Sequence, residues 1–201
     1  MKLVLASGNP GKLQEIGQLL APLGIELVSQ AELGIAEAEE PHETFVENAL
    51  AKARHASRVA RLPALADDSG LCVDALGGEP GVHSAHFAGR EGSREQRDAR
   101  NNEKLLASLR DECRAERRAY YCCLMVLVRS ENDPRPLVAE GIWHGEIARA
   151  PRGANGFGYD PFFFLPSLQK TAAELAPEHK NRISHRGIAL QKLLGLLNDQ
   201  A

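Results

Sequence analysis

Hydrophobic and polar positions in the first third of the chain follow two different periods. Apolar runs at residues 2–6 and 25–28 have the length of buried strands, and apolar residues between them recur at helical spacing over residues 10–22. Residues 44–47 match a capping box, which predicts a helix that ends near Ala60. Strands and helices that alternate in this way are typical of an α/β protein.

The middle of the chain contains the strongest strand signals. Residues 120–128 form an unbroken apolar and aromatic run, as in a central strand, and residues 137–147 follow a turn as its predicted hairpin partner. Residues 64–66 predict a short buried strand that ends at an acidic segment, and residues 71–74 predict a separate strand. A polar helix is expected over residues 93–109.

The last helix is expected to begin at Ser184, a favourable N-cap residue. Its apolar stripe would consist of Leu190, Leu193, Leu194 and Leu197. Because a hairpin interrupts the alternation of strands and helices, the predicted fold class is α/β, with a mixed sheet flanked by helices. We expect a single domain over residues 1–201 with two lobes, and the hairpin is the expected boundary between them.

Composition and net charge argue against some classes of function. The chain has 201 residues, of which 43% are hydrophobic and 25% charged, as in a soluble globular protein. Its net charge of −3 argues against a nucleic-acid partner. No apolar run approaches the ~18 residues that span a bilayer, so we expect a cytoplasmic protein without a membrane partner. The cysteines lack a C-x-x-C pair and are expected to be buried thiols: Cys72, Cys113, Cys122 and Cys123.

The first predicted strand leads into a segment rich in glycine that ends in a lysine: Ser7, Gly8, Asn9, Pro10, Gly11 and Lys12. Backbone N–H groups, the positive end of the next helix and the Lys12 ammonium would converge there, which favours binding of an anion such as a phosphate. The spacing differs from that of a P-loop. Glycine and proline also serve ordinary strand-to-helix turns, so both interpretations stay open for this segment alone.

Asp67 and Asp68 follow the short buried strand that the sequence predicts. Ligands in open α/β sheets bind at the carboxyl ends of strands, and neighbouring strand residues point to opposite faces. One carboxylate could therefore meet a ligand such as Mg²⁺, which needs one or two carboxylates besides substrate phosphates. The second carboxylate is expected from Glu40, with Glu37 and Glu39 as alternatives. A turn held by aspartate is the alternative without a metal.

Two later segments combine residues that suit a nucleotide. Glycines and aromatic residues at 153–161 allow close backbone approach and stacking of a base, and a proline holds Asp160 extended. His185 and Arg186 would lie in the first turn of the last helix, where cations are unfavourable unless an anion or a carbonyl lies against them. The alternatives are aromatic residues in the core and, for Lys52, an ordinary surface charge.

Six segments, taken in order, resemble the Ham1/RdgB family of inosine triphosphate pyrophosphatases. They are SGNPGK at 7–12, FVENA with a following KA at 45–53, DDSG at 67–70, LGGEPG at 76–81, GFGYDP at 156–161 and SHRG at 184–187. The resemblance implies a mixed α/β fold of two lobes with a nucleotide cleft between them, commonly a homodimer. It also implies Mg²⁺-dependent hydrolysis of ITP, dITP and XTP to the monophosphate and pyrophosphate, which cleanses the nucleotide pool of deaminated purines.

The resemblance further implies roles for individual residues. Asp68, Lys52 and Asp67 are the expected catalytic residues, with Asp68 orienting or deprotonating the attacking water, and Asp68 and Glu40 are the expected metal ligands. Phe157 is expected to stack on the base, while Arg186 and His185 would donate to the purine 6-oxo group. The expected substrate-binding residues are Ser7, Gly8, Asn9, Pro10, Gly11, Lys12, Ser69, Phe157, Gly158, Tyr159, Asp160, Lys180, His185 and Arg186.

Other function classes fit the sequence less well. The low aromatic content of 5% and the negative charge argue against an RNA-binding module. A nucleotide-binding protein without catalysis needs no carboxylates beside its phosphate loop. A related-fold pyrophosphatase for modified pyrimidine triphosphates is the nearest alternative enzyme, and the two segments that suit a purine favour the first interpretation. The expected partner is thus a nucleoside triphosphate substrate.

Overall fold

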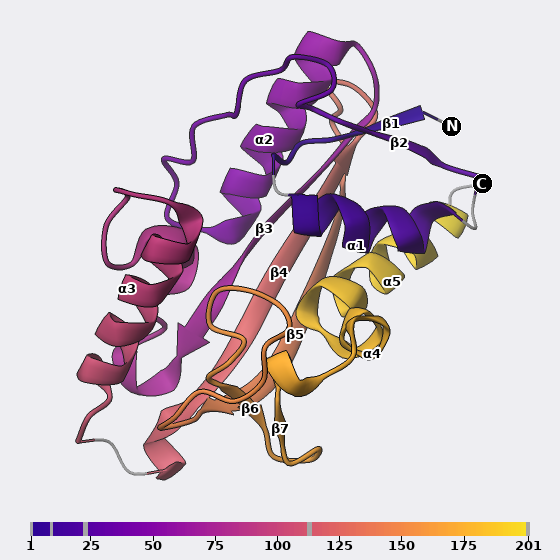
Figure 1. Cartoon of the computed structure of the whole chain (residues 1–201). Helices are drawn as coiled ribbons and strands as arrows, with labels where there is room; N and C mark the ends of the chain where they lie inside the picture. Colours follow the sequence, from indigo (N-terminus) through magenta and orange to yellow (C-terminus); the bar gives the residue numbers. More distant parts are fainter. Residues whose placement is uncertain (1, 9, 22–23, 112–113, 200–201) are drawn as a thin grey trace. The chain divides into compact units, whose positions relative to one another are not determined.

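A mixed β-sheet with helices packed against it organises the chain (Figure 1). The computed structural model describes residues 2–8, 10–21, 24–111 and 114–199. Its strands are β1 (Lys2–Leu5), β2 (Glu26–Ser29), β3 (Ala64–Val73), β4 (Arg118–Val128), β5 (Leu137–Ile147), β6 (Phe163–Leu165) and β7 (Lys170–Thr171). Its α-helices are α1 (Pro10–Leu20), α2 (Phe45–Ala60), α3 (Arg94–Ser108), α4 (Pro177–Ile183) and α5 (His185–Asn198).

The order of the strands shows why the sheet is mixed. Among the described residues the order is β2-β1-β3-β4-β5-β6-β7. β1 is parallel to both of its neighbours, whereas β6 is antiparallel to both β5 and β7. The α/β class with a mixed sheet and flanking helices, predicted from the sequence, is therefore confirmed.

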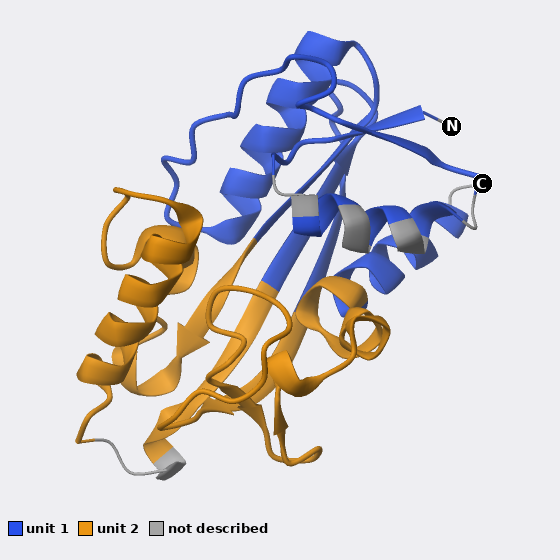
Figure 2. Ribbon diagram, viewed as in Figure 1, with its two compact units in different colours: residues 1–68, 123–141, 188–201 blue, residues 69–122, 142–187 orange. Residues whose placement is uncertain are grey.

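The chain divides into two compact units (Figure 2). Unit 1 comprises residues 1–68, 123–141 and 188–201, and unit 2 comprises residues 69–122 and 142–187. The chain passes between the units after Asp68 within β3, after Cys122 within β4, after Gly141 within β5 and after Gly187 within α5. Two of these crossings lie in the hairpin strands, where the sequence predicts the boundary.

In unit 1, alternate residues of β3 enter two separate hydrophobic clusters. Leu65 packs in a cluster with apolar residues of α1 and α5, whereas Ala64 and Ala66 pack in a cluster with alanines of α2. Figure 1 shows α1 beside α5, with α2 on another face of the strands. Because side chains of a strand alternate between its faces, the two residues after Ala66 also point to opposite sides, toward α1 and α2 respectively.

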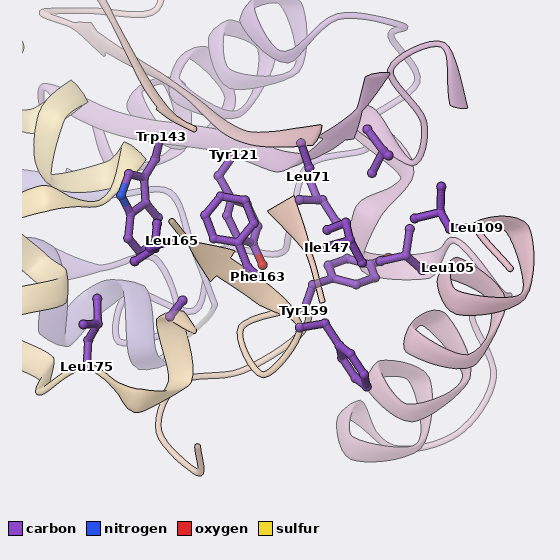
Figure 3. Packing of buried hydrophobic residues seen from close by; sticks show 14 residues of the cluster. Leu71, Leu105, Leu109, Tyr121, Trp143, Ile147, Tyr159, Phe163, Leu165 and Leu175 are labelled. Carbon is purple, nitrogen blue, oxygen red and sulfur yellow. The ribbon is translucent and has the colours of Figure 1, made fainter. Parts of the chain in front are cut away.

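In unit 2, the core is built mainly from aromatic side chains. Tyr121 of β4 contacts Phe163 of β6, with ring centroids 4.7 Å apart, and Phe163 lies 5.2 Å from the Trp143 ring (Figure 3). Tyr159 belongs to the same cluster, together with Leu105 of α3. Aromatic pairs at these separations add to the stability that unit 2 gains from apolar burial.

The structure corrects the sequence prediction at the acidic segment. β3 runs without a break from Ala64 to Val73, so Asp67, Asp68 and Ser69 lie inside one strand and not at the end of a short one. Polar residues usually end a buried strand because an unpaired buried charge is costly. Here lysine side chains pair with both carboxylates, so the strand continues. The sequence analysis also does not predict α4, β6 or β7.

Most predicted boundaries are confirmed. The Thr44 side chain accepts a hydrogen bond from the Glu47 amide at the start of α2, and Ser93 caps α3. Ser184 accepts from the Gly187 amide, as expected for the cap of the last helix. Three of the cysteines, Cys72, Cys122 and Cys123, are buried thiols as predicted, whereas Cys113 lies outside the described residues. Over those residues, no helix has both the length and the apolar character to span a bilayer.

Candidate functional site

The neighbouring carboxylates of β3 are held by lysines from two different helices, all within unit 1. Lys12, in the first turn of α1, places its Nζ 2.9 Å from Asp67 Oδ2. Lys52, in the middle of α2, places its Nζ 3.0 Å from Asp68 Oδ1. The sequence prediction that the two aspartates point to opposite faces is confirmed, and each carboxylate meets a cation on its own side of the strand.

Asp68 is the centre of the larger polar cluster. Lys52 Nζ also lies 3.1 Å from the Glu40 Oε1, so that one ammonium group bridges two carboxylates. The Asn48 amide nitrogen donates to Asp68 Oδ2 over 3.4 Å and to the His42 carbonyl, which ties the loop before α2 to the site. Asp68 is only 6% exposed and Lys52 only 9%, so the surface-charge interpretation of Lys52 is wrong.

Burial and pairing oppose each other in the pKa values of this cluster. Burial raises the pKa of Asp68 above its ordinary value, because desolvation disfavours the carboxylate more than the nearby Lys52 favours it. Burial acts to lower the pKa of Lys52, but the carboxylates of Asp68, Asp67 and Glu40 outweigh it and raise this pKa. Lys52 therefore stays charged, while Asp68 retains a higher proton affinity than an exposed aspartate.

The cluster fits a divalent metal ion with hard oxygen ligands. Asp68 and Glu40 each place one carboxylate oxygen next to the same cation, the Lys52 ammonium. The described residues contain no group of three or more metal-ligating side chains, but Mg²⁺ needs only one or two carboxylates when substrate phosphates supply the rest. Of the other glutamates considered, Glu37 lies against Gly8, so Glu40 is the one that shares a cation with Asp68.

The predicted phosphate-binding segment connects β1 to α1. Ser7 and Gly8 follow the strand, and Pro10 begins the helix, where its missing N–H group costs nothing. Gly11 and Lys12 lie in the first turn of α1. The Lys12 ammonium group is therefore carried by the same turn as the positive end of the helix dipole, as predicted. Asn9 lies outside the described residues.

Unit 2 contains the predicted base-binding segment, which is irregular as expected. The Asp160 carboxylate accepts a hydrogen bond from the Phe157 amide over 2.9 Å and pairs with Lys180 Nζ at 2.6 Å. Asp160 is 2% exposed and Lys180 7%. Lys180 Nζ also lies 5.1 Å from the centre of the Phe157 ring. Three predicted residues are thus brought together, although a helix that the sequence analysis does not predict, α4, supplies one of them.

Two residues that are predicted to bind the substrate pack against other residues of unit 2, which makes a direct contact with a ligand less favourable. Tyr159 is 4% exposed, belongs to the core and donates its hydroxyl hydrogen to the Ser84 carbonyl, while burial raises its pKa. The His185 ring stacks on Tyr121, with centroids 4.7 Å apart, and faces Trp143 at 6.3 Å. Tyr159 therefore lies in the core, as the alternative interpretation has it, and its role toward the substrate stays a prediction.

Arg186 and Ser69 meet although 117 positions separate them in the sequence. The Arg186 guanidinium donates to the Ser69 hydroxyl over 3.2 Å, and the arginine is 5% exposed. Both residues belong to unit 2, and both are predicted to contact the substrate. A buried guanidinium in the first turn of a helix is costly for the helix, which is a feature of functional sites.

Other residues contact the site but were missed by the sequence analysis. Asn48 was noted only as part of a motif, and it touches Asp68. Arg94 and Asp98 of α3 contact the Phe157–Gly158 segment. The sequence does contain a signal for Asn48, because this polar residue lies among apolar positions of a helix that begins with a capping box. It contained none for the α3 residues, because their partners lie about 60 positions away.

The chain is similar to known proteins over nearly its whole length. The model of the Ham1 family matches residues 3–196. A relative from Bordetella pertussis is 64% identical over 196 residues, which cover 98% of this chain and 91% of the relative, and one from Burkholderia pseudomallei is 61% identical over 198 residues, covering 98% and 94%. Both relatives are described as dITP/XTP pyrophosphatases.

Solved structures show the same similarity. A HAM1 protein from Coxiella burnetii superimposes with a TM-score of 0.91 at 49% identity, over 99% of each chain. A nucleoside-triphosphatase / dITP/XTP pyrophosphatase from Mycobacterium abscessus gives a TM-score of 0.75 at 47% identity, over 96% of this chain and 99% of the other. The match of the family model, residues 3–196, extends over both units and includes all six segments noted in the sequence.

Proposed function

This chain belongs to the Ham1 family, and we propose that it is a pyrophosphatase that hydrolyses dITP, XTP and ITP to the monophosphate and pyrophosphate. The relatives at 61–64% identity, described as dITP/XTP pyrophosphatases, support this proposal. The observation that carries it is the cluster in which Lys52 pairs with the buried Asp68 and with the exposed Glu40, since a protein that only binds a nucleotide needs no carboxylates there.

In the proposed mechanism, unit 1 supplies the groups that act on the triphosphate. The N–H groups at the start of α1 and the Lys12 ammonium bind phosphate oxygens, and Lys52 offsets the charge that develops on the leaving pyrophosphate. Asp68 orients the attacking water and accepts its proton, a role that its raised pKa supports. Asp67 holds Lys12 in place.

We further propose that Asp68 and Glu40 hold Mg²⁺. When bound, the ion would neutralise phosphate charge and favour loss of pyrophosphate. Water adds across the bond between the α and β phosphates, so that one oxygen atom and two hydrogen atoms are shared between the monophosphate and pyrophosphate. We also propose that the protein is a homodimer, as the family resemblance implies, and that it is cytoplasmic. Light scattering of the purified protein measures its mass and so tests the dimer.

Unit 2 supplies the groups proposed to recognise the base. Phe157 offers a ring for stacking, and Arg186 donates hydrogen bonds to the 6-oxo group of a deaminated purine. Adenine presents a donor at this position, so its amino group and the buried guanidinium would both lack a partner. Sites built on such pairs can reject the mismatched base by up to ~10⁴-fold.

The proposed function is tested by pyrophosphate release from dITP, XTP, ITP, GTP, ATP and dTTP, with Mg²⁺ and with a chelator. We expect rapid release from the first three nucleotides with Mg²⁺ and loss of activity in the chelator. Equal or faster turnover of dTTP would support the alternative of a pyrimidine enzyme. Binding without release of pyrophosphate from any nucleotide would contradict the catalytic proposal.

The base-recognition role of Arg186 makes a separate prediction. In an Arg186→Ala variant we expect the ratio of kcat/KM for ITP to that for ATP to fall by at least about tenfold, the effect of one lost hydrogen bond to a charged group. Arg182→Ala is the matched control, since Arg182 is exposed and lies one turn earlier in the sequence. An unchanged ratio in a folded Arg186→Ala variant would remove this residue from base selection.

A further inference from the structure

Three polar residues of α3 lie in a row along the helix and contact one short segment of unit 2. Arg94, Asp98 and Asn102 are four positions apart, which places them on the same helical face. The Arg94 guanidinium carbon lies 4.5 Å from the centre of the Phe157 ring. Asp98 Oδ2 accepts a hydrogen bond of 3.0 Å from the Gly158 amide, and the Asn102 amide nitrogen donates to the Gly158 carbonyl over 3.0 Å.

The same segment is held from another helix by the Asp160–Lys180 pair. Asp160 Oδ2 binds both Lys180 Nζ and the Phe157 amide. The amide groups of Phe157 and Gly158 therefore each donate to a carboxylate, one from the segment itself and one from α3. Gly158 has a φ of +61°, a left-handed conformation that glycine adopts without strain. The contacts to its N–H and carbonyl groups hold the backbone next to the Phe157 ring.

Asp98 has two roles in this arrangement. Besides accepting from the Gly158 amide, its Oδ2 lies 4.0 Å from Arg94 Nε, and Arg94 in turn covers the Phe157 ring. One carboxylate thus orients both the backbone next to the ring and the cation against the ring. The Asp98 side chain is 27% exposed, and partly exposed polar contacts of this kind add little to global stability, so its effect is local.

We propose that Asp98 is a positioning residue for base recognition, which through the Gly158 amide and the Arg94 guanidinium fixes the Phe157 ring that stacks on the purine. This inference rests on the proposed function, because it assigns Asp98 to the same nucleotide site. The described contacts of Asp98 act on the segment proposed to recognise the base, so its loss is expected to affect binding of the substrate and to leave the chemical step intact.

The test compares Asp98→Ala with Asp98→Asn, in which an amide oxygen can still accept from Gly158. We expect Asp98→Ala to raise the KM for dITP about tenfold with kcat nearly unchanged, since a hydrogen bond to a charged group is lost. Asp98→Asn is expected to restore most of the wild-type KM. Arg94→Ala, which removes the cation from the ring, is expected to raise KM about two- to fivefold. Glu103→Ala is the control, an exposed carboxylate on the same helix.

Amide hydrogen exchange of Gly158, measured by NMR, provides a readout that does not depend on catalysis. Exchange is expected to be faster in Asp98→Ala than in the wild type and in Asp98→Asn. A wild-type protein inactive on every nucleotide would refute the proposed function but leave this exchange result intact. An unchanged KM in Asp98→Ala and Arg94→Ala would overturn the positioning role. A fall in kcat that accompanies a fall in melting temperature would overturn it as well, because it would indicate a structural role.

Discussion

Replacing Asp68 by asparagine is expected to lower the turnover of dITP by at least about a hundredfold. The amide cannot accept a proton from water, and it weakens the proposed Mg²⁺ site, which needs negative oxygen ligands. The side chains have almost the same shape, so Asn48 and Lys52 can still contact residue 68. Steady-state release of pyrophosphate, measured at saturating substrate, gives the change in kcat.

A second aspartate of the same region provides the control for Asp68. Asp74 follows β3 directly, its side chain is 47% exposed, and it pairs only loosely with Arg118 at 3.5 Å. Asp74→Asn is expected to keep wild-type turnover. Near-normal turnover in an Asp68→Asn protein with an unchanged melting temperature would exclude Asp68 from the chemical step, whatever binds the metal.

Replacing Lys180 by methionine is expected to cause the largest loss of stability. Methionine has a similar length but no charge, so the Asp160 carboxylate, 3% exposed in its side chain, would stay buried without its cation. Breaking a buried ion pair in this way lowers the free energy of unfolding by about 3–5 kcal/mol. For a chain of this size that corresponds to a fall in melting temperature of roughly 10 °C. Thermal denaturation followed by circular dichroism measures it.

An exposed ion pair serves as the matched control for this experiment. Lys2 pairs with Glu26 at 3.3 Å, but the two side chains are 47% and 67% exposed. Because solvent screens such pairs, Lys2→Met is expected to change the free energy of unfolding by less than about 1 kcal/mol. Equal small losses in Lys2→Met and Lys180→Met would mean that the Lys180–Asp160 pair does not stabilise unit 2.

Local patterns in the sequence were sufficient to predict most helices and strands and part of the candidate site. Hydrophobic periodicity and the caps at Thr44 and Ser184 located the helices they begin, because these signals depend on residues a few positions apart. The opposite orientation of Asp67 and Asp68 also followed from the sequence, because side chains alternate along any strand. These predictions needed no knowledge of which distant segments meet.

Where the sequence analysis was wrong or left alternatives open, distant contacts decided the structure. It ended a strand at the two aspartates, but lysines from α1 and α2 pair with both carboxylates and allow β3 to continue. It left open whether the aromatic residues at 153–161 meet a base or pack in the core, and distant contacts place the Tyr159 ring in the core of unit 2. Neither contact could be inferred from nearby residues, because each partner lies far away in the chain.

The amino-acid sequence by itself determined the α/β class, the order of the main elements and the residue types available for binding a phosphorylated ligand, since local periodicity and chemistry encode these properties. Only the tertiary structure decided which charges are paired. It paired Glu40, the loop glutamate that the sequence already favoured, with Lys52, and it placed Asp98 against Gly158. The reason is physical: a buried charge needs a partner, and the fold alone determines which partner is within reach.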